Sequence, residues 1–322
     1  MRSEKEMLDL IIRTAREDER IIAAYLEGSR VDPNAQKDIF RDYDVEYIVR
    51  DTAPFIADKS WIDRFGERLF MQYPDDCPFE KSDTKNCYGW LIRFSDGNRL
   101  DLHVCTPEHA LKNIDICRVL VDKENIIPQD IGKDTTVFNV KKPTQAEFSA
   151  VCNEFWWCLD NVAKGLWRGE LSYTLEMMDF NIRPQLRQML DWLTGAENGF
   201  TISTGKSSKY MARFLPEEIC SRYLSTYCAA RANEIWDAVG VMTELFDETA
   251  RKTSAMLDYC YNEREAAACI GYLDHVRNLP QDAFDILKGK RYEKISEILC
   301  PSLSSFARAF AVHLAAQGLC RL

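Results

Sequence analysis

The sequence lacks the features of a membrane protein or a secreted protein. No apolar run is long enough to span a bilayer, and residues 1–18 form a charged amphipathic stretch instead of a secretory signal. Internal repeats and low-complexity segments are also absent. We therefore expect a cytoplasmic protein without a membrane partner.

No Cys-x-x-Cys pair occurs, although the sequence contains twelve cysteines. Closely spaced cysteines, such as Cys152 with Cys158 and Cys220 with Cys228, lie in apolar, helix-like stretches. Free cysteine is often buried, so we interpret these residues as core residues and not as disulfides or zinc ligands. The histidines are too scattered along the sequence to predict a metal site; they are His103, His109, His275 and His313.

An excess of basic residues is missing as well. The chain has 41 Lys and Arg against 51 Asp and Glu, a formal net charge of −10. Domains that bind nucleic acid by neutralising phosphates are usually basic, so the charge argues against a nucleic-acid partner. It is compatible with a cationic small molecule, although many acidic proteins are simply soluble.

The sequence does contain enough apolar residues, 46% of 322, for two domains of ordinary size. Residues 3–18 and 61–71 have helical spacing. Residues 21–26 and 43–49 are typical of strands, and residues 88–105 are typical of a hairpin with its turn at Ser95–Asn98.

From Pro143 onward the pattern is helical. Thr144 and Glu147 form a capping box ahead of a helix at 148–166, and Pro184 should kink or break the next one. The further helices are expected at 171–194, 208–229 and 231–260. We predict an α+β fold, in which a small mixed β-sheet with flanking helices (1–140) precedes an all-helical domain (141–322).

Two segments of the first domain suit phosphate chemistry. Glu27-Gly28-Ser29-Arg30 ends a strand, where glycine lets backbone N–H groups approach an anion, although an ordinary turn has the same sequence. Asp42 and Asp44 are two apart on a strand, so both carboxylates point to one face. Mg²⁺ would relieve their repulsion; a solvated pair on an edge strand is the alternative.

A third carboxylate follows the hairpin turn. Asp101 interrupts an apolar alternation between Leu100 and Leu102, so it either faces solvent or meets a partner, and His103 shares its face. A two-metal phosphoryl-transfer site needs such a carboxylate to hold a metal and to take the proton from the attacking hydroxyl.

In its order of motifs, the chain resembles the polymerase-β-like nucleotidyltransferases and, more narrowly, the streptomycin (aminoglycoside) 6-adenylyltransferases. The similarity runs from residue 1 to about residue 275. The remainder, from about residue 280, matches nothing in the family and forms a C-terminal extension with a helix-like stretch at 306–316. The matching segments are Met1–Glu4, Leu26–Arg30, Asp42–Asp44, Asp96–Leu102, Cys152–Trp156, Lys164–Leu166, Ile182–Pro184, Gly205-Lys206 and Lys209–Met211.

The resemblance implies transfer of AMP from Mg-ATP to the 6-hydroxyl of streptomycin, with release of pyrophosphate and resistance to the antibiotic. It also implies that Gly28-Ser29-Arg30 binds ATP. Asp42 and Asp44 would anchor two Mg²⁺ ions, while Asp101 binds the metal nearest the α-phosphate and serves as general base.

The helical half supplies further candidates. Lys206 and Lys209 lie in a glycine-containing loop from which they could reach the triphosphate, although isolated lysines are commonly plain surface residues. Arg183 is a candidate of the same kind. Glu154 and Trp157 are candidate ligands of a cationic aminoglycoside. Glu154 lies among apolar residues, where an unpaired buried carboxylate is costly, which favours a functional role over a core role.

Other interpretations remain open. Gly205-Lys206-Ser207 is not a P-loop, because Phe200 stands where that pattern needs a glycine. The acceptor could instead be a nucleotide, an RNA end or a protein hydroxyl. A non-catalytic nucleotide-binding protein is a third possibility; the loss of a carboxylate would be its usual sign, and all three are present. The oligomeric state is not predicted.

Overall fold

The computed structural model describes residues 1–130 and 134–287. The stretch predicted to be helical at 306–316 lies outside the described residues. Two compact units make up the chain. The first contains Met1–Lys141 together with Asn198–Ser207, and the second contains Lys142–Glu197 and the residues that follow Ser207. We describe each unit by itself.

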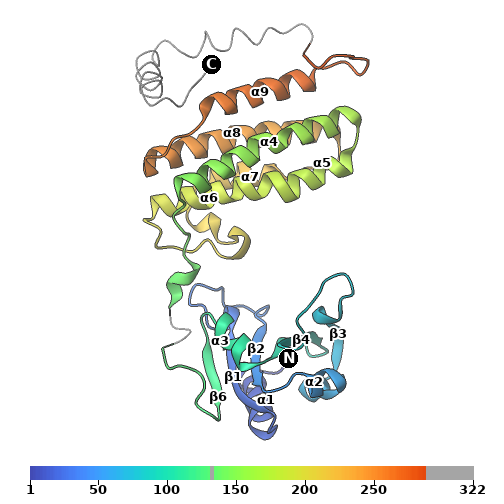
Figure 1. The fold of residues 1–322 in the computed structure, drawn as a ribbon, viewed down its shortest axis with the longest axis vertical. Coiled ribbons are helices and arrows are strands. Elements are labelled where there is room, and N and C mark those ends of the chain that lie inside the picture. The colour runs from blue at the N-terminus through green and yellow to red at the C-terminus, as the bar shows by residue number, and fades with distance from the viewer. Residues whose placement is uncertain (131–133, 288–322) are drawn as a thin grey trace, which may run out of the picture. The chain divides into compact units, whose positions relative to one another are not determined.

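The first unit is built on a mixed six-stranded sheet with the order β3-β4-β5-β2-β1-β6 (Figure 1). Only β2 and β5 pair in parallel among the described strands; the other neighbours are antiparallel. The strands are β1 (Ile21–Glu27), β2 (Tyr43–Val49), β3 (Arg68–Gln72), β4 (Cys87–Phe94), β5 (Arg99–Cys105) and β6 (Arg118–Asp122).

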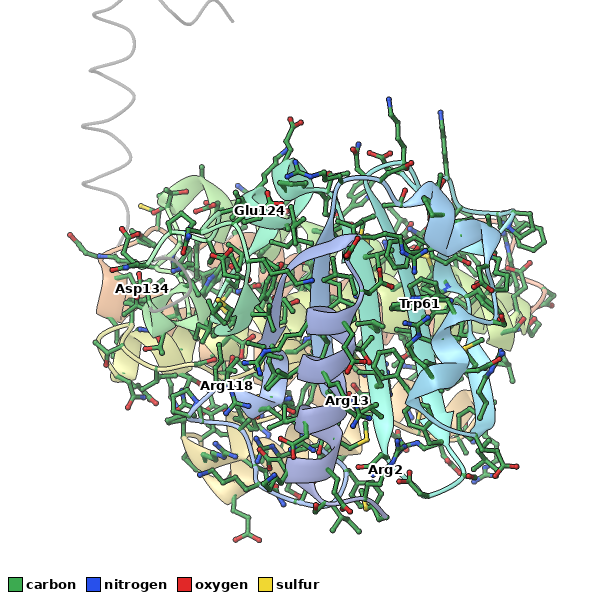
Figure 2. The ribbon with its side chains drawn as sticks, turned by 90° about the horizontal axis from the view of Figure 1, so that it is seen from below. Arg2, Arg13, Trp61, Arg118, Glu124 and Asp134 are labelled. Carbon is green, nitrogen blue, oxygen red and sulfur yellow. The ribbon has the colours of Figure 1, made fainter. Side chains whose placement is uncertain are left out.

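One face of this sheet forms the main core of the unit. Helix α1 (Glu4–Glu17) lies across that face, as Figure 2 shows, and buries Met7, Ile11 and Ala15 against the strands. Every second residue of β2 points to it, and the hydroxyl of one of them, Tyr47, donates a hydrogen bond of 2.6 Å to the Ile11 carbonyl oxygen. The alternate residues of β2, including Asp44, therefore point to the opposite face.

Within the described part of the first unit, the opposite face has apolar packing at one end only. There α3 (Pro107–Asn113) contributes Ala110 to a smaller apolar cluster with Tyr25, Ile48 and Cys105. At the other end of β2 and β5, polar side chains replace apolar ones. This change along the strands leaves the carboxylates of the sheet at its uncovered end.

The second unit is helical. In the described residues its α-helices are α4 (Gln145–Arg168), α5 (Leu171–Met177), α6 (Arg183–Glu197), α7 (Glu217–Ser225), α8 (Ala232–Leu257) and α9 (Glu263–Arg277). The capping box of Thr144 and Glu147 is present at the start of α4. Phe155 of α4 stacks on Phe246 of α8 with ring centroids 3.7 Å apart, in a core that also buries Trp192.

The fold class predicted from the sequence is confirmed, but some elements differ. Residues 61–71, predicted as a helix, form a short 3₁₀ turn, η2 (Trp61–Phe65), and the edge strand β3. Strand β6 and helix α3 were not predicted. Of the helix expected at 208–229, only α7 forms, directly after Pro216. The break expected near Pro184 is a π-helical turn, Met178–Ile182, that lies just before α6.

In the part of the chain that the structure describes, no helix has the length and apolarity needed to cross a membrane.

Candidate active site

Three aspartates meet at the uncovered end of the sheet. Asp44 and Asp101 are direct partners across the parallel pair β2–β5, and Asp42 precedes β2 by one residue. One carboxylate oxygen from each lies within 4.8 Å of the others. Their spacing follows from the register of two neighbouring strands, which points both partners to the same face. These oxygen donors are of the kind that Mg²⁺ prefers.

The electrostatics of the cluster favour a cation. Burial, with the negative charges of Asp42 and Asp101, raises the pKa of Asp44 from 3.8 to about 7. Glu27, the partner of Asp44 on β1, behaves similarly, because burial and the neighbouring carboxylates of Glu46 and Asp44 raise its pKa to about 7. A bound divalent cation would remove this repulsion, so the donor set fits a magnesium site.

The raised pKa of Asp44 predicts a pH dependence of stability. Between about pH 4 and about pH 7 the native state holds a proton that the unfolded state has released, so stability without metal falls as the pH rises. In chelator, Asp44→Asn, which cannot ionise, should therefore gain thermal stability relative to wild type over this interval. Melting temperatures of both proteins at about pH 5 and about pH 8 check this. A difference that does not change with pH would contradict it.

Gly28 and Ser29 lie beside the aspartates. They begin the 3₁₀ turn η1 (Gly28–Arg30), which follows β1 directly. Gly28 has a φ of +65°, and a Cβ atom there would lie 2.0 Å from Oδ2 of Asp44. Ser29 Oγ is 3.5 Å from Oδ1 of Asp42. The turn thus packs its backbone against the carboxylates, a contact that only glycine permits at position 28.

The side chain of Arg30 forms hydrogen bonds with the loop that carries Asp42. Its Nε donates to the Asp42 carbonyl oxygen at 2.7 Å, and its Nη2 donates to the Arg41 carbonyl oxygen at 2.9 Å. The guanidinium also pairs with Glu4 at 3.0 Å and stacks on the Tyr43 ring, which leaves the side chain 7% exposed. These contacts indicate a positioning role for Arg30, whereas the sequence suggested that it binds ATP.

Arg30→Lys should lower kcat/KM by about tenfold to 100-fold, because lysine cannot donate to two carbonyl oxygens in a fixed fork and the loop with Asp42 would shift. Steady-state kinetics measure the effect. Arg50→Lys, which changes an exposed ion pair with Glu124, is the control and should stay near wild type. Equal rates for both variants would refute the positioning role.

Arg99 is a site residue that the sequence analysis missed. Its guanidinium makes a two-pronged contact with Asp101, Nε at 2.8 Å and Nη2 at 2.5 Å, and its Nε lies 3.7 Å from Oδ2 of Asp42. Arg99 precedes Asp101 by two residues on β5, so both side chains point to one face. That spacing was the available signal for its place among the carboxylates.

A second polar row lies next to the aspartates on the same face. Glu46 and His103 are partners across β2 and β5, with Nδ1 of His103 3.1 Å from Oε1 of Glu46. Although burial opposes it, the hydrogen bond and charge of Glu46 raise the pKa of His103 to about 9. Gly89 of β4 lies against this histidine, because a Cβ atom there would be 2.3 Å from its ring.

The candidate residues in the second half of the chain differ in the unit to which they belong and in their exposure. Lys206 belongs to the first unit and Lys209 to the second, and both are exposed. Arg183 is 3% exposed; it donates to the hydroxyl and carbonyl oxygens of Thr226 and pairs with Asp179. This burial favours a structural role for Arg183 over the phosphate-binding role considered from the sequence.

Glu154 and Trp157 lie one turn apart on α4. Both are exposed, and Trp157 is 71% exposed. The sequence argument treated Glu154 as a buried carboxylate, and this was wrong, because Glu154 is exposed. Phe155 and Trp156 face the core, whereas positions 154 and 157 share the outer side of the helix. An exposed tryptophan beside a carboxylate keeps both residues available to a cationic ligand.

The cysteines agree with the expectation only in part, and Cys228 is half-buried instead of buried. Cys152, Cys158 and Cys220 are buried core residues, as predicted. The conclusion that cysteine and histidine form no candidate metal site was wrong, however, because the fold brings the side chains of Cys87, Cys105 and His109 together.

Comparison with known proteins gives consistent matches. The family model described as streptomycin adenylyltransferase matches residues 1–276. An aminoglycoside 6-adenylyltransferase of Bacillus subtilis (strain 168) is 34% identical over 265 residues, 81% of this chain and 93% of that protein. One of Campylobacter jejuni is 36% identical over 265 residues, 81% of this chain and 91% of that protein. A crystal structure of an aminoglycoside 6-adenyltransferase from Bacillus subtilis is 31% identical, with a TM-score of 0.44, and covers 87% of this chain and 100% of that one.

Proposed function

Because the chain belongs to the streptomycin adenylyltransferase family and is thus a nucleotidyltransferase, we propose that it transfers AMP from Mg-ATP to a hydroxyl of an aminoglycoside. The proposed acceptor is the 6-hydroxyl of streptomycin, pyrophosphate is the leaving group, and modification of the drug confers resistance. The observation that carries this proposal is the meeting of three carboxylates within 4.8 Å on a parallel strand pair.

Asp42, Asp44 and Asp101 would hold the magnesium ions. Bound there, Mg²⁺ supplies the positive charge that offsets the negative charge on the attacking and leaving oxygens. Asp42 and Asp44 anchor the site from β2 and the loop before it. In the proposal, the backbone of Gly28 and the hydroxyl of Ser29 face the phosphates beside them.

Asp101 takes the proton from the attacking hydroxyl. Its carboxylate is half-buried and is held in place by the two donors of Arg99. That contact fixes the orientation of the oxygens that would face the acceptor, which is a requirement for efficient proton transfer. Arg99 is therefore assigned a positioning role, as Arg30 is on the other side of the cluster.

Recognition of the two substrates is assigned to exposed residues. Lys206 and Lys209 are proposed to meet the negative phosphates of ATP, since both ammonium groups lie at the surface. Glu154 and Trp157 are proposed to meet the cationic aminoglycoside, the carboxylate by charge and the indole by a cation–π contact.

The test is direct. The purified protein is incubated with Mg-ATP and streptomycin, pyrophosphate release is followed, and the drug is analysed by mass spectrometry for the added AMP. A panel of other aminoglycosides, a nucleotide and a protein acceptor runs in parallel. Modified streptomycin supports the proposal. ATP binding without turnover on any aminoglycoside would overturn the acceptor assignment, and turnover on another acceptor alone would replace it.

A further inference from the structure

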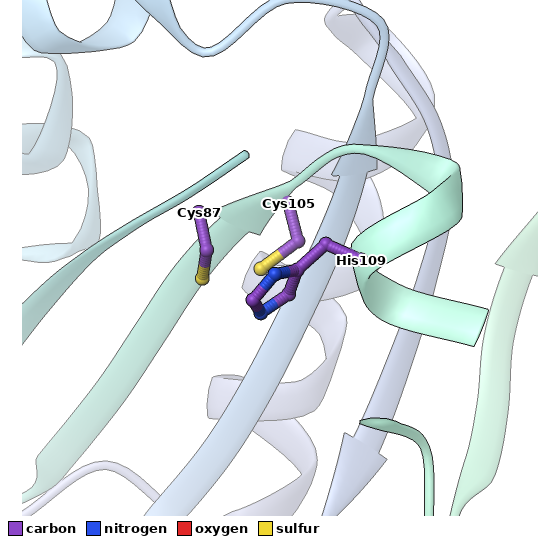
Figure 3. A group of neighbouring side chains, drawn as sticks. All are labelled: Cys87, Cys105 and His109. Atoms are coloured by element: carbon purple, nitrogen blue, oxygen red, sulfur yellow. The ribbon is translucent and has the colours of Figure 1, made fainter. Parts of the chain in front are cut away.

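Two cysteines and one histidine form a separate cluster at the covered end of the sheet. Cys87 and Cys105 are direct partners across the antiparallel strands β4 and β5, so their side chains point to the same face. Figure 3 shows both sulfur atoms beside the imidazole of His109, which comes from α3. One potential ligand atom from each of the three residues lies within 4.8 Å of the others.

The position of His109 is fixed by the segments that carry the cysteines. The backbone N–H of Thr106 donates to the Asn86 carbonyl oxygen at 2.8 Å, which joins the residue before α3 to the residue before Cys87. The side chain of Thr106 then caps α3 by accepting from the His109 backbone N–H. The imidazole therefore approaches the two thiols from a helix that is anchored to the same strands.

The donor set selects a class of cation. Two thiolates and an imidazole are ligands of zinc and similar borderline or soft metals, whereas magnesium and calcium prefer oxygen. A carboxylate lies next to the cluster as well, because Oε2 of Glu46 is 2.9 Å from Sγ of Cys105. Cys105 is buried, but Cys87 and His109 are half-buried, so a cation can enter from their side.

We propose that Cys87, Cys105 and His109 bind a zinc ion or a similar thiophilic divalent cation, at a site distinct from the three aspartates. Cys105 follows Asp101 by four residues along β5, a separation of about 13 Å. The site goes beyond the proposed transfer reaction and supplies none of its groups. Its effect is to tie β4, β5 and α3 together, and binding to the native state alone raises stability.

Cobalt substitution tests the proposal. The full chain is reduced, freed of metal and titrated with Co²⁺, whose bonds to thiolate give a near-ultraviolet charge-transfer band that oxygen ligands do not give. Wild type and Asp44→Asn, which alters the carboxylate site, should both show the band. Zn²⁺ should then displace Co²⁺ and raise the melting temperature of the wild-type protein.

The two half-buried residues of the proposed site, Cys87 and His109, are substituted to test the binding of zinc. Cys87→Ser and His109→Gln should each weaken Zn²⁺ binding by more than about 100-fold, since loss of even an outer-shell partner costs tenfold to 100-fold. Cys117→Ser is the matched control, because Cys117 is also half-buried and packs in the same apolar cluster without belonging to the ligand group. It should bind Zn²⁺ like wild type.

Two results would overturn the proposal. One is the absence of the charge-transfer band in reduced wild-type protein whose circular dichroism spectrum shows that it is folded. The same conclusion holds if Cys87 and Cys105 are found joined by a disulfide before reduction and the band is absent afterwards. The other is a band that persists unchanged in both Cys87→Ser and His109→Gln. The spectrum is recorded without substrates. The adenylyl-transfer assay can therefore fail while metal binding is observed, and metal binding can be absent while the transfer is observed.

Discussion

Asn in place of Asp101 should lower kcat for AMP transfer by about 10³-fold, because the amide neither accepts the proton of the attacking hydroxyl nor offers a charged ligand to a metal. The side chains have nearly the same shape, and Arg99, whose guanidinium is partly exposed, can be hydrated when its charged partner is lost. We therefore expect the fold to persist and KM for ATP to change much less than kcat.

Pyrophosphate release under saturating substrates measures this loss, and the melting temperature reports on the fold. Asp9→Asn is the control, since Asp9 is exposed on α1 and makes only a surface ion pair with Lys5. Its kcat should equal that of wild type. If Asp101→Asn retains a rate near wild type, another group takes the proton and the assignment of the base is wrong.

Gly28→Ala should reduce turnover by about 100-fold or more, because the new methyl group would occupy the space of the Asp44 carboxylate, 2.0 Å from its Oδ2. Either the carboxylate or the η1 turn must move, and both lie at the proposed metal site. The positive φ of Gly28 adds a backbone strain of about 1 kcal/mol for alanine.

A substitution at Gly97 separates the effect of the clash with Asp44 from the effect of backbone strain. Gly97 has a φ of +88° in the hairpin turn, and a Cβ atom there meets nothing within 4 Å. Gly97→Ala should therefore lose a similar amount of stability from backbone strain while keeping its turnover. Kinetics and thermal unfolding of both variants give the comparison. If the two variants lose activity equally, strain and not the clash with Asp44 explains the effect.

The sequence carries much of the local information about the site. Alternation in β2 is enough to place Asp42 and Asp44 on one face, and the turn at Ser95–Asn98 sets the hairpin that follows. The hairpin register also pairs Cys87 with Cys105, so this contact could have been predicted by extending the ladder. Arg99 shares the face of Asp101, but strand alternation alone does not distinguish an arginine that pairs with a carboxylate from one that faces solvent.

Long-range contacts explain what the sequence did not predict. The parallel pairing of β2 with β5 joins strands that are far apart in the chain, and no local pattern encodes it. His109 reaches the cysteines only because α3 folds back over the sheet. Strand β3 was not predicted because its apolar residues Leu69 and Phe70 are exposed at an edge, where the usual alternation of a strand is absent.

The pairing of Asp44 with Asp101 also determines where the length of the chain can vary. Because side chains alternate along a strand, one inserted residue within β2 would turn Asp44 or its neighbours to the α1 side and separate the carboxylates. An insertion in the loop before Asp42 or in the loop before β4 leaves the register intact. Any reshaping of the enzyme for a different acceptor is therefore best sought in its connecting loops, with the two central strands kept at fixed length.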